Sequence, residues 1–312
     1  MKKIAFLFPG QGSQKVGMGQ DIAEELEQAR AVFESADQVS GLPITQLCHE
    51  GPMDALTQTV NLQPAVTAVN LAFLAAVRSA GIEPAVCAGH SLGEYSALCA
   101  AGVVTVQDCL KLVFKRGELM HREAGLNRGA MSALVGLDIH AVQQIVAQAA
   151  HSGIVAVANH NSAEQIVITG APEAVAAAGK LASDKGARAI PLKVSGAWHS
   201  PLIRGAEGAF AAFLDSVAFT PPTLEVLHNV SAAAESDPQR IRSLMARQLC
   251  SPVRWYDTIV SMMDREVTVF VEIGPGRVLT GLLKKILPKA SPARTYNVFD
   301  MQSLERLVEA EG

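Results

Sequence analysis

The sequence predicts an α/β protein in which a parallel sheet is flanked by helices and a smaller antiparallel module is inserted. Two observations carry this prediction. Short apolar runs alternate with longer helical patterns toward both ends of the 312-residue chain, an order typical of parallel sheets. The middle of the chain changes to the order β-α-β-β-α-β. The length has room for one large domain or for two unequal ones.

The N-terminal part of the chain supplies the first strand and two helices. Residues 4–8 are entirely apolar and end at the glycine-rich turn FPGQGSQ, so we expect a buried strand there. One helix follows, and its apolar positions are Ile22, Leu26, Ala29 and Phe33. A second helix is expected from Pro64 to Gly81, because proline favours helix starts and glycine favours helix ends.

The next unit repeats the alternation of strand and helix. Residues 85–89 form the expected strand, Ser91 a tight turn, and residues 92–101 the helix after it. The segment TVQD resembles a capping box and opens a further helix that is expected to run to about Glu123.

Residues 129–194 carry the different order. Strands are expected in AMSALVGL, GIVAVANHN, EQIVITG and ARAIPLKV, and helices in DIHAVQQIVAQAA and APEAVAAAGKLASDKG. This is the split arrangement of ferredoxin-like folds. We therefore expect residues 129–194 to form a small ferredoxin-like subdomain. Residues 1–128 and 195–312 are expected to form the large α/β subdomain, with further strands in LEVLHNV and VTVFVEIG.

The composition excludes several classes of protein. The net charge of -4 and the pI of about 6.1 lack the basic balance of nucleic-acid-binding proteins. The five cysteines form no C-x-x-C pair, which favours reduced thiols inside the cell. The apolar run in MKKIAFLFPGQ is too short for a signal peptide, and no run approaches the ~18 residues that span a bilayer. We expect a cytoplasmic protein with no nucleic-acid or membrane partner.

The stretch GHSLGEY contains the pattern G-x-S-x-G around Ser91. In hydrolase-like α/β folds this pattern places a serine hydroxyl at the apex of a sharp strand-to-helix turn. Short matches also occur by chance, so an ordinary turn serine is the alternative interpretation. The expected strand before Ser91 and the expected helix after it favour a nucleophile, which would need a nearby base.

His199 is the best candidate for that base among the eight histidines. It lies in SGAWHSPLI, at the mouth of an expected helix, where a positive imidazole is disfavoured. A general base must be neutral, as this position predicts. His90 adjoins Ser91 and better suits a role in shaping the turn, while His160 and His228 end predicted strands. A histidine that serves packing alone remains the alternative for His199.

Arg116 lies on the apolar face of a predicted helix. In VQDCLKLVFKRGELM that face holds Cys109, Val113 and Met120, and a period of 3.6 residues places Arg116 among them. A guanidinium is almost never buried without an anion. Two interpretations follow: an ion pair with an internal Asp or Glu, or a fork that binds a substrate carboxylate.

Two glycine-rich turns follow predicted strands. FPGQGSQ lacks the lysine-serine ending of a P-loop and the third glycine of a dinucleotide fingerprint, so phosphate binding is disfavoured. Its backbone N–H groups suit an oxyanion instead. EIGPGRVLTG is interpreted as structural or pocket-lining.

Six motifs together resemble one family. FPGQGSQ, GHSLGEY, the arginine of KRGELM, NHNS, WHSPL and EIGPGRVLTG occur in the order seen in malonyl-CoA:acyl carrier protein transacylases. The resemblance covers about residues 4–287. Six motifs in order are far more specific than any one of them, and the family fold agrees with the inserted module that the strand order predicts.

The resemblance implies roles for individual residues. Ser91 would be the nucleophile and His199 its base. The backbone amides of Gln11 and Leu92 would form the oxyanion hole, and Arg116 would bind the substrate carboxylate.

Two further positions match the family less directly, and a third departs from it. The carbonyl of Gln248, in RQLCSPVRW, would orient the histidine, so that the third triad member is a carbonyl. Gln63, in LQPA, matches another position of the substrate pocket. Trp198 stands where many relatives carry phenylalanine or a smaller residue, and its ring is expected to favour malonyl over methylmalonyl groups.

The implied reaction transfers a malonyl group from malonyl-CoA to the phosphopantetheine thiol of acyl carrier protein, in fatty acid biosynthesis. No metal or redox cofactor is implied, because phosphopantetheine is carried by the partner, and a monomer is expected. Three alternatives stay open: a related transacylase of polyketide synthesis or malonate decarboxylation, a serine thioesterase or esterase, and a docking domain without activity. The histidine of α/β-hydrolases usually comes late, whereas 113 residues follow His199, which disfavours a hydrolase.

Overall fold

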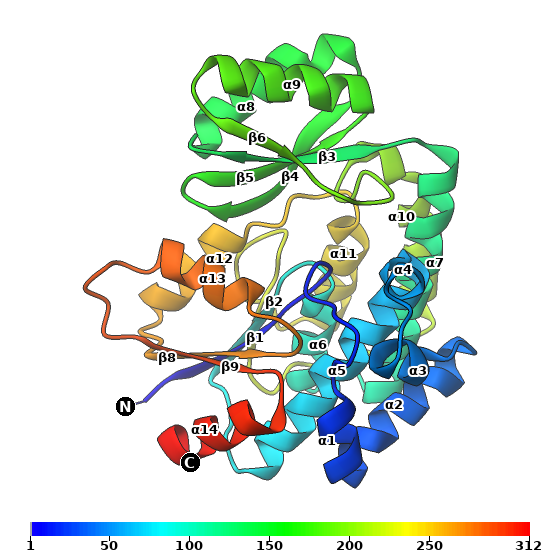
Figure 1. Ribbon diagram of the computed structural model, residues 1–312, viewed down its shortest axis with the longest axis vertical. Helices are drawn as coiled ribbons and strands as arrows, with labels where there is room; N and C mark the ends of the chain where they lie inside the picture. The colour runs from blue at the N-terminus through cyan, green and yellow to red at the C-terminus, as the bar shows by residue number, and fades with distance from the viewer. Residues whose placement is uncertain (1) are drawn as a thin grey trace.

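The computed structural model describes residues 2–312. Its larger sheet has five strands, all parallel, and helices surround it (Figure 1). The strand order is β7-β2-β1-β8-β9, and every neighbouring pair is parallel. The strands are β1 (Ile4–Phe8), β2 (Val86–Gly89), β7 (Glu225–Leu227), β8 (Val269–Ile273) and β9 (Arg294–Val298). All residues of β1, β2 and β8 are buried, as expected where helices cover both faces of a parallel sheet.

Twelve of the helices among residues 2–312 belong to the same part of the fold as this parallel sheet. Their bounds are α1 (Gln20–Glu25), α2 (Glu27–Ser40), α3 (Ile44–His49), α4 (Met53–Thr57), α5 (Thr59–Ser79), α6 (Gly93–Ala100), α7 (Val106–Leu126), α10 (Gly205–Asp215), α11 (Pro238–Gln248), α12 (Trp255–Asp264), α13 (Val278–Ile286) and α14 (Met301–Glu311). The alternate side chains of β1 enter two separate cores. Phe6 and Phe8 pack in the cluster that includes α2, α5, α6 and α7, while Ala5 and Leu7 pack with α12 and α13.

The middle of the chain forms a separate antiparallel sheet with the strand order β4-β5-β3-β6. Its strands are β3 (Ala130–Val135), β4 (Val155–Ser162), β5 (Gln165–Gly170) and β6 (Arg188–Pro191). Helices α8 (Ile139–Ala149) and α9 (Pro172–Asp184) cover its outer face (Figure 1). The predicted fold class, a helix-flanked parallel sheet with an inserted ferredoxin-like module, is thereby confirmed. We propose that this module is a subdomain bounded near residues 129 and 194.

Three expected helices differ in detail. The helix predicted to carry Ile22 through Phe33 is two helices, α1 and α2, which meet at the extended residue Leu26. The helix predicted to start at Pro64 begins at Thr59, so that Pro64 lies inside it. Burial of Thr59, Leu62 and Gln63 outweighs the one backbone hydrogen bond that proline cannot donate. The helix expected at Ser200 starts as a 3₁₀ turn over Pro201–Ile203 and continues as α10.

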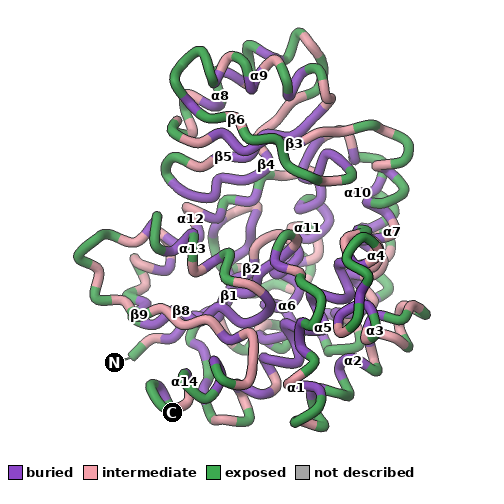
Figure 2. The backbone as a smooth tube through the Cα atoms, in the orientation of Figure 1, coloured by how far each residue is buried: buried purple, intermediate pink, exposed green. Residues whose placement is uncertain are grey.

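Helix α5 is long and apolar enough to cross a membrane by length and composition. Its mean hydropathy over 18 residues is 1.5, which the sequence analysis did not foresee, yet 83% of that window is buried inside the protein. The helix packs against α2 and α7, so its composition is that of a core helix. Figure 2 shows the same pattern, with buried residues along the central strands and helices and exposed residues on the outer turns.

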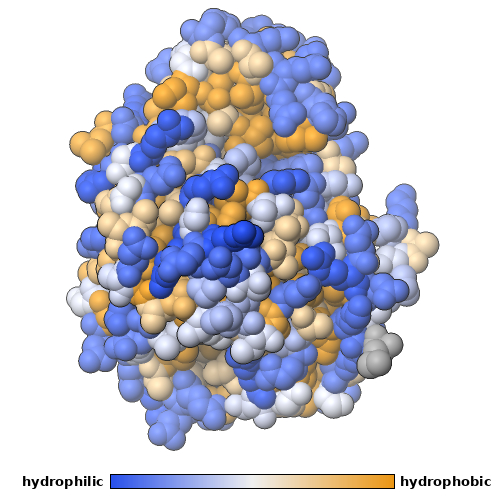
Figure 3. All heavy atoms as spheres, turned by 180° about the vertical axis from the view of Figure 1, so that it is seen from behind, coloured by the Kyte–Doolittle hydropathy of each residue, from blue (hydrophilic) through white to orange (hydrophobic). Residues whose placement is uncertain are grey.

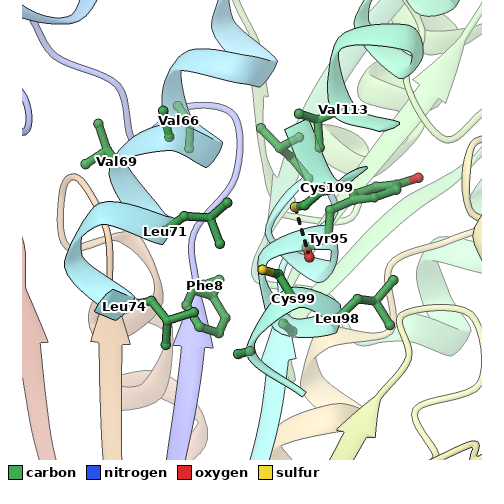
Figure 4. Packing of buried hydrophobic residues seen from close by; sticks show 14 of the residues in the cluster. Phe8, Val66, Val69, Leu71, Leu74, Tyr95, Leu98, Cys99, Cys109 and Val113 are labelled. Atoms are coloured by element: carbon green, nitrogen blue, oxygen red, sulfur yellow. Dashed lines mark hydrogen bonds between the residues drawn. The ribbon is translucent and has the colours of Figure 1, made fainter. Parts of the chain in front are cut away.

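The core beneath the carboxyl ends of β1 and β2 fixes the elements that carry the predicted site. Figure 4 shows Phe8, at the end of β1, among the apolar side chains of α5 and α6. The Cys109 thiol of α7 donates a hydrogen bond of 3.3 Å to the backbone carbonyl of Tyr95 in α6. The helices that hold the predicted site residues are therefore held together by buried contacts.

Seen from behind, hydrophilic side chains cover much of the outer surface (Figure 3).

Candidate active site

Ser91 occupies a strained turn between β2 and α6. Its φ angle of 52° lies in the left-handed region, which side chains other than glycine rarely adopt. The flanking glycines are required by close contacts: a Cβ at Gly89 would lie 1.9 Å from the Gly93 carbonyl carbon, and one at Gly93 would lie 1.9 Å from the Phe8 oxygen. Asn229 closes the turn, because its side chain accepts from the Ser91 amide at 2.7 Å and donates to the Gly89 carbonyl at 2.7 Å.

The glycine-rich turn after β1 lies directly against this serine turn. A Cβ at Gly10 would lie 2.5 Å from the His90 carbonyl oxygen, so only glycine lets the two backbones approach. Gln11 and Leu92 both line the cavity that contains Ser91. Within the described part of the chain, neither backbone amide donates to a protein acceptor. Two unpaired donors beside a serine hydroxyl suit the developing negative charge of an oxyanion.

His199 meets Ser91 across 108 residues of sequence. Its Nε2 lies 2.7 Å from the Ser91 Oγ. Its Nδ1 lies 2.9 Å from the Gln248 carbonyl oxygen and 3.1 Å from the Ser251 carbonyl oxygen. Carbonyls only accept, so Nδ1 carries the hydrogen and Nε2 is left to accept the serine proton. The carbonyl of Gln248 is available for this role because it ends helix α11, where its other contact is a long hydrogen bond of 3.4 Å from the Ser251 amide.

The environment of His199 keeps its ring neutral. Burial, and next the positive charge of Arg116, lower the pKa of His199 to about 3. The imidazole is therefore uncharged at pH 7, the state in which it can take a proton from a hydroxyl. The predicted cause of this neutrality, a helix N-terminus, differs from the causes in the structure, which are burial and the nearby arginine.

Arg116 is buried beside the serine, with 2% of its surface exposed. Its Nη1 donates to Gln63 Oε1 at 2.9 Å, and its Nη2 donates to Gln248 Oε1 and to Ser91 Oγ, each at 3.2 Å. None of the ion pairs found among residues 2–312 includes it. The internal ion pair considered from the sequence is therefore not formed, and the guanidinium has only neutral hydrogen-bond acceptors around it.

Gln63 and Gln248 hold the guanidinium from two sides. Gln63, in α5, also donates to the Met120 sulfur at 3.2 Å. Gly117 favours the close approach of α5 and α7 beside Arg116, since a Cβ there would lie 3.0 Å from the Thr59 oxygen. All seven residues predicted from the sequence thus gather around one site, although Gln63 acts on Arg116 and only indirectly on the cavity.

The cavity over Ser91 has a volume of about 120 Å³ and lies between the two sheets. Its lining residues are Gln11, His90, Ser91, Leu92, Arg116, Met120, Met131, Asn159, Leu192, Val194, Trp198 and His199. The antiparallel module supplies four of them, from β3, β4 and the segment after β6. Trp198 lines the cavity next to His199, as its predicted effect on the acyl group requires. The space suits a small acyl group, polar at the arginine and apolar at the methionines.

Four contributors were not foreseen. Asn229 and Ser251 act through the contacts given above, and Asn161 Oδ1 accepts from His90 Nε2 at 2.8 Å. Glu94, in GHSLGEY, is buried and accepts from the Gln248 amide at 2.6 Å. Of these, Asn161 lies in the motif NHNS and Glu94 in the motif GHSLGEY, and membership of these motifs was the sequence signal that could have indicated them. His228 is structural and pairs with Glu94, and His160 packs against Tyr256.

The site combines a neutral histidine that contacts a strained serine, two unpaired backbone amides and a buried arginine. This combination defines an α/β enzyme that transfers acyl groups. Within residues 2–312 no group of three or more His, Cys, Asp or Glu side chains is placed to hold a metal ion. A sequence model of the family described as "Acyl transferase domain" matches residues 5–305. The chain is thus an acyltransferase.

Individual relatives are more specific. A malonyl CoA-acyl carrier protein transacylase of Bacillus subtilis is 40% identical over 311 residues, which cover 99% of this chain and 97% of that one. An Escherichia coli protein of the same name is 39% identical over 289 residues, or 92% and 94% of the two chains. The chain belongs to the malonyl-CoA:acyl carrier protein transacylase family.

Solved structures agree with this assignment. The acyl carrier protein S-malonyltransferase of Vibrio cholerae has a TM-score of 0.93 and 41% identity, covering 98% of this chain and 100% of that one. A malonyl-transacylase in complex with a type II PKS acyl-carrier protein has a TM-score of 0.95 and 38% identity, covering 99% and 100%.

Proposed function

We propose that this protein transfers the malonyl group of malonyl-CoA to the phosphopantetheine thiol of an acyl carrier protein, in fatty acid biosynthesis. The observation that carries the proposal is the buried guanidinium of Arg116, which has no acidic partner and lies 3.2 Å from the Ser91 hydroxyl. A malonyl thioester places a free carboxylate close to its reacting carbonyl. The names of the relatives support the same substrate and partner.

The first half-reaction forms an ester on Ser91. His199 Nε2 takes the proton of the Ser91 hydroxyl as Oγ attacks the thioester carbonyl. The amides of Gln11 and Leu92 donate to the oxyanion. The carbon–sulfur bond then breaks, and the proton on His199 passes to the coenzyme A thiolate. Malonyl-Ser91 and free coenzyme A remain.

The second half-reaction reverses these steps with a different thiol. His199 takes the proton of the phosphopantetheine thiol, whose sulfur attacks the malonyl ester. The ester bond to Ser91 breaks, and the serine oxygen recovers a proton from His199. A malonyl thioester of the carrier is the product, and no residue of the chain is consumed.

The substrate carboxylate also tunes the base. Burial, and next the positive charge of Arg116, hold the pKa of His199 below its ordinary value. A carboxylate on Arg116 would offset the second of these causes, so the pKa of His199 would rise and the ring would accept a proton more readily. Malonyl-CoA would therefore improve the base that activates the attacking Ser91 hydroxyl, which acetyl-CoA cannot do.

The chemistry requires neither metal nor redox cofactor, and a cytoplasmic location fits the substrate. All five cysteines are free in the structure, which supports a reducing compartment. A transacylase serving polyketide assembly would use the same site with another carrier, and the complex named above shows such a carrier with a relative. A monomer remains a prediction.

The reaction is tested by mixing the protein with malonyl-CoA and a phosphopantetheinylated acyl carrier protein. Mass spectrometry should show the carrier gaining one malonyl group, while a carrier without phosphopantetheine, the control, should gain none. Free malonate with an unmodified carrier would instead indicate the thioesterase alternative. Comparing carriers of fatty acid and polyketide synthesis would identify the natural partner.

A further inference from the structure

Glu94 is a buried carboxylate that the reaction above does not use. Only 1% of it is exposed, and it lies in the first turn of α6. Its Oε1 lies 2.8 Å from His228 Nδ1, and its Oε2 accepts from the Asn229 amide at 3.3 Å and from Gln248 Nε2 at 2.6 Å. Such a charge is strongly attractive to any nearby cation in a site of low dielectric.

The nearby cation is Arg116, and the side chain of Gln248 separates the two charges. Gln248 Oε1 accepts from Arg116 Nη2 at 3.2 Å, while its Nε2 donates to Glu94 Oε2 and to the Ser91 carbonyl at 3.0 Å. Only this orientation of the amide fits its partners, because the reverse would set NH₂ against the guanidinium and oxygen against a carboxylate.

We propose that the Gln248 side chain is a positioning residue that keeps Arg116 and Glu94 from forming an ion pair, so that the guanidinium stays open to the substrate carboxylate. This inference rests on the proposed function. Glu94 remains near enough to favour the charged guanidinium: burial lowers the pKa of Arg116, and Tyr95 and then the negative charge of Glu94 act against this. The Gln248 side-chain amide thus lets Glu94 attract the Arg116 guanidinium while it prevents direct contact between the two charges.

The arrangement has a consequence for specificity. An arginine paired with Glu94 would no longer need a carboxylate on the substrate, and malonyl and acetyl groups would be treated more alike. The backbone carbonyl that orients His199 belongs to the same residue but does not depend on its side chain. Specificity can therefore be changed at Gln248 without removing the histidine's partner.

The test is a double-mutant cycle read as the ratio of kcat/KM for malonyl-CoA to that for acetyl-CoA. Gln248→Ala should lower the ratio about tenfold or more, because Arg116 then pairs with Glu94. Adding Glu94→Gln should restore most of the loss by removing that partner. A ratio is independent of the fraction of protein that is folded, and melting temperatures monitor the fold separately.

Two results would overturn the proposal that the Gln248 side chain keeps Arg116 and Glu94 apart, which we call its spacer role. One is an unchanged ratio in Gln248→Ala, and the other is a double variant whose ratio is no higher than that of Gln248→Ala. A purely structural role predicts the first result, because both substrates are then slowed together and their ratio does not change. If the alanine variant does not fold, Gln248→Asn replaces it, since its amide is one methylene too short to reach both charges. Arg116→Ala separates a failure of the spacer role from a failure of the proposed function. If this variant leaves the malonyl-to-acetyl ratio unchanged, the proposed function fails, and the spacer role fails with it.

Discussion

Replacing His199 with alanine should slow malonyl transfer by roughly 10²–10⁴-fold, the range for a lost acid/base group. The loss follows from the geometry, since Nε2 of the neutral ring lies 2.7 Å from the Ser91 hydroxyl. The rate of coenzyme A release from malonyl-CoA in the presence of carrier measures the effect. The fold should be retained, because His199 lines a cavity and its loss leaves the core clusters intact.

His121→Ala is the matched control, because His121 is exposed on α7 and does not line the cavity. It should keep the parent rate. A His199→Ala protein that works at nearly the parent rate would show that the base lies elsewhere, with His90, on the cavity wall, as the next candidate.

Replacing Arg116 with alanine should remove the preference for malonyl over acetyl groups. Two charge-assisted hydrogen bonds to a carboxylate contribute about 1.5–3 kcal/mol each. At ~1.4 kcal/mol for each tenfold change, their loss lowers malonyl transfer by roughly 10²–10⁴-fold. Acetyl-CoA offers no carboxylate and leaves the buried charge of Arg116 uncompensated, so its rate should hold or rise in the variant.

Two further variants sharpen this result. Arg116→Lys keeps the charge without the planar fork and should restore malonyl transfer only in part. Arg122→Ala, which removes a half-exposed arginine of the same helix from its pair with Glu123, should leave the malonyl-to-acetyl ratio unchanged. A lowered melting temperature with an unchanged ratio in Arg116→Ala would mean that this arginine is structural.

The fold was largely predictable because its signals are local. The apolar strand at residues 4–8 and the order of elements in 129–194 indicate both sheets without any knowledge of distant contacts. Errors arose where tertiary contacts outweigh a local signal. The apolar stripe runs unbroken through Leu26, where α1 ends, and Pro64 lies inside α5 because the residues before it are buried.

The site was predictable only in part. Spacing indicated the serine turn and the buried face of Arg116, whereas Gln11, Leu92, Gln63 and Gln248 came from family resemblance. Asn229 stabilises Ser91 across 138 residues of sequence, and the Ser251 carbonyl reaches His199 through backbone alone. Backbone acceptors carry no side-chain signature, so no pattern could have indicated them.

The proposed reaction depends on a malonyl ester that forms on Ser91. The most direct measurement is mass spectrometry of the tryptic peptide that contains Ser91, after incubation of the protein with malonyl-CoA and no carrier. We expect one malonyl group on that serine, which disappears when phosphopantetheinylated carrier is added. A malonyl group on another residue, or an active protein that never carries one, would contradict the account.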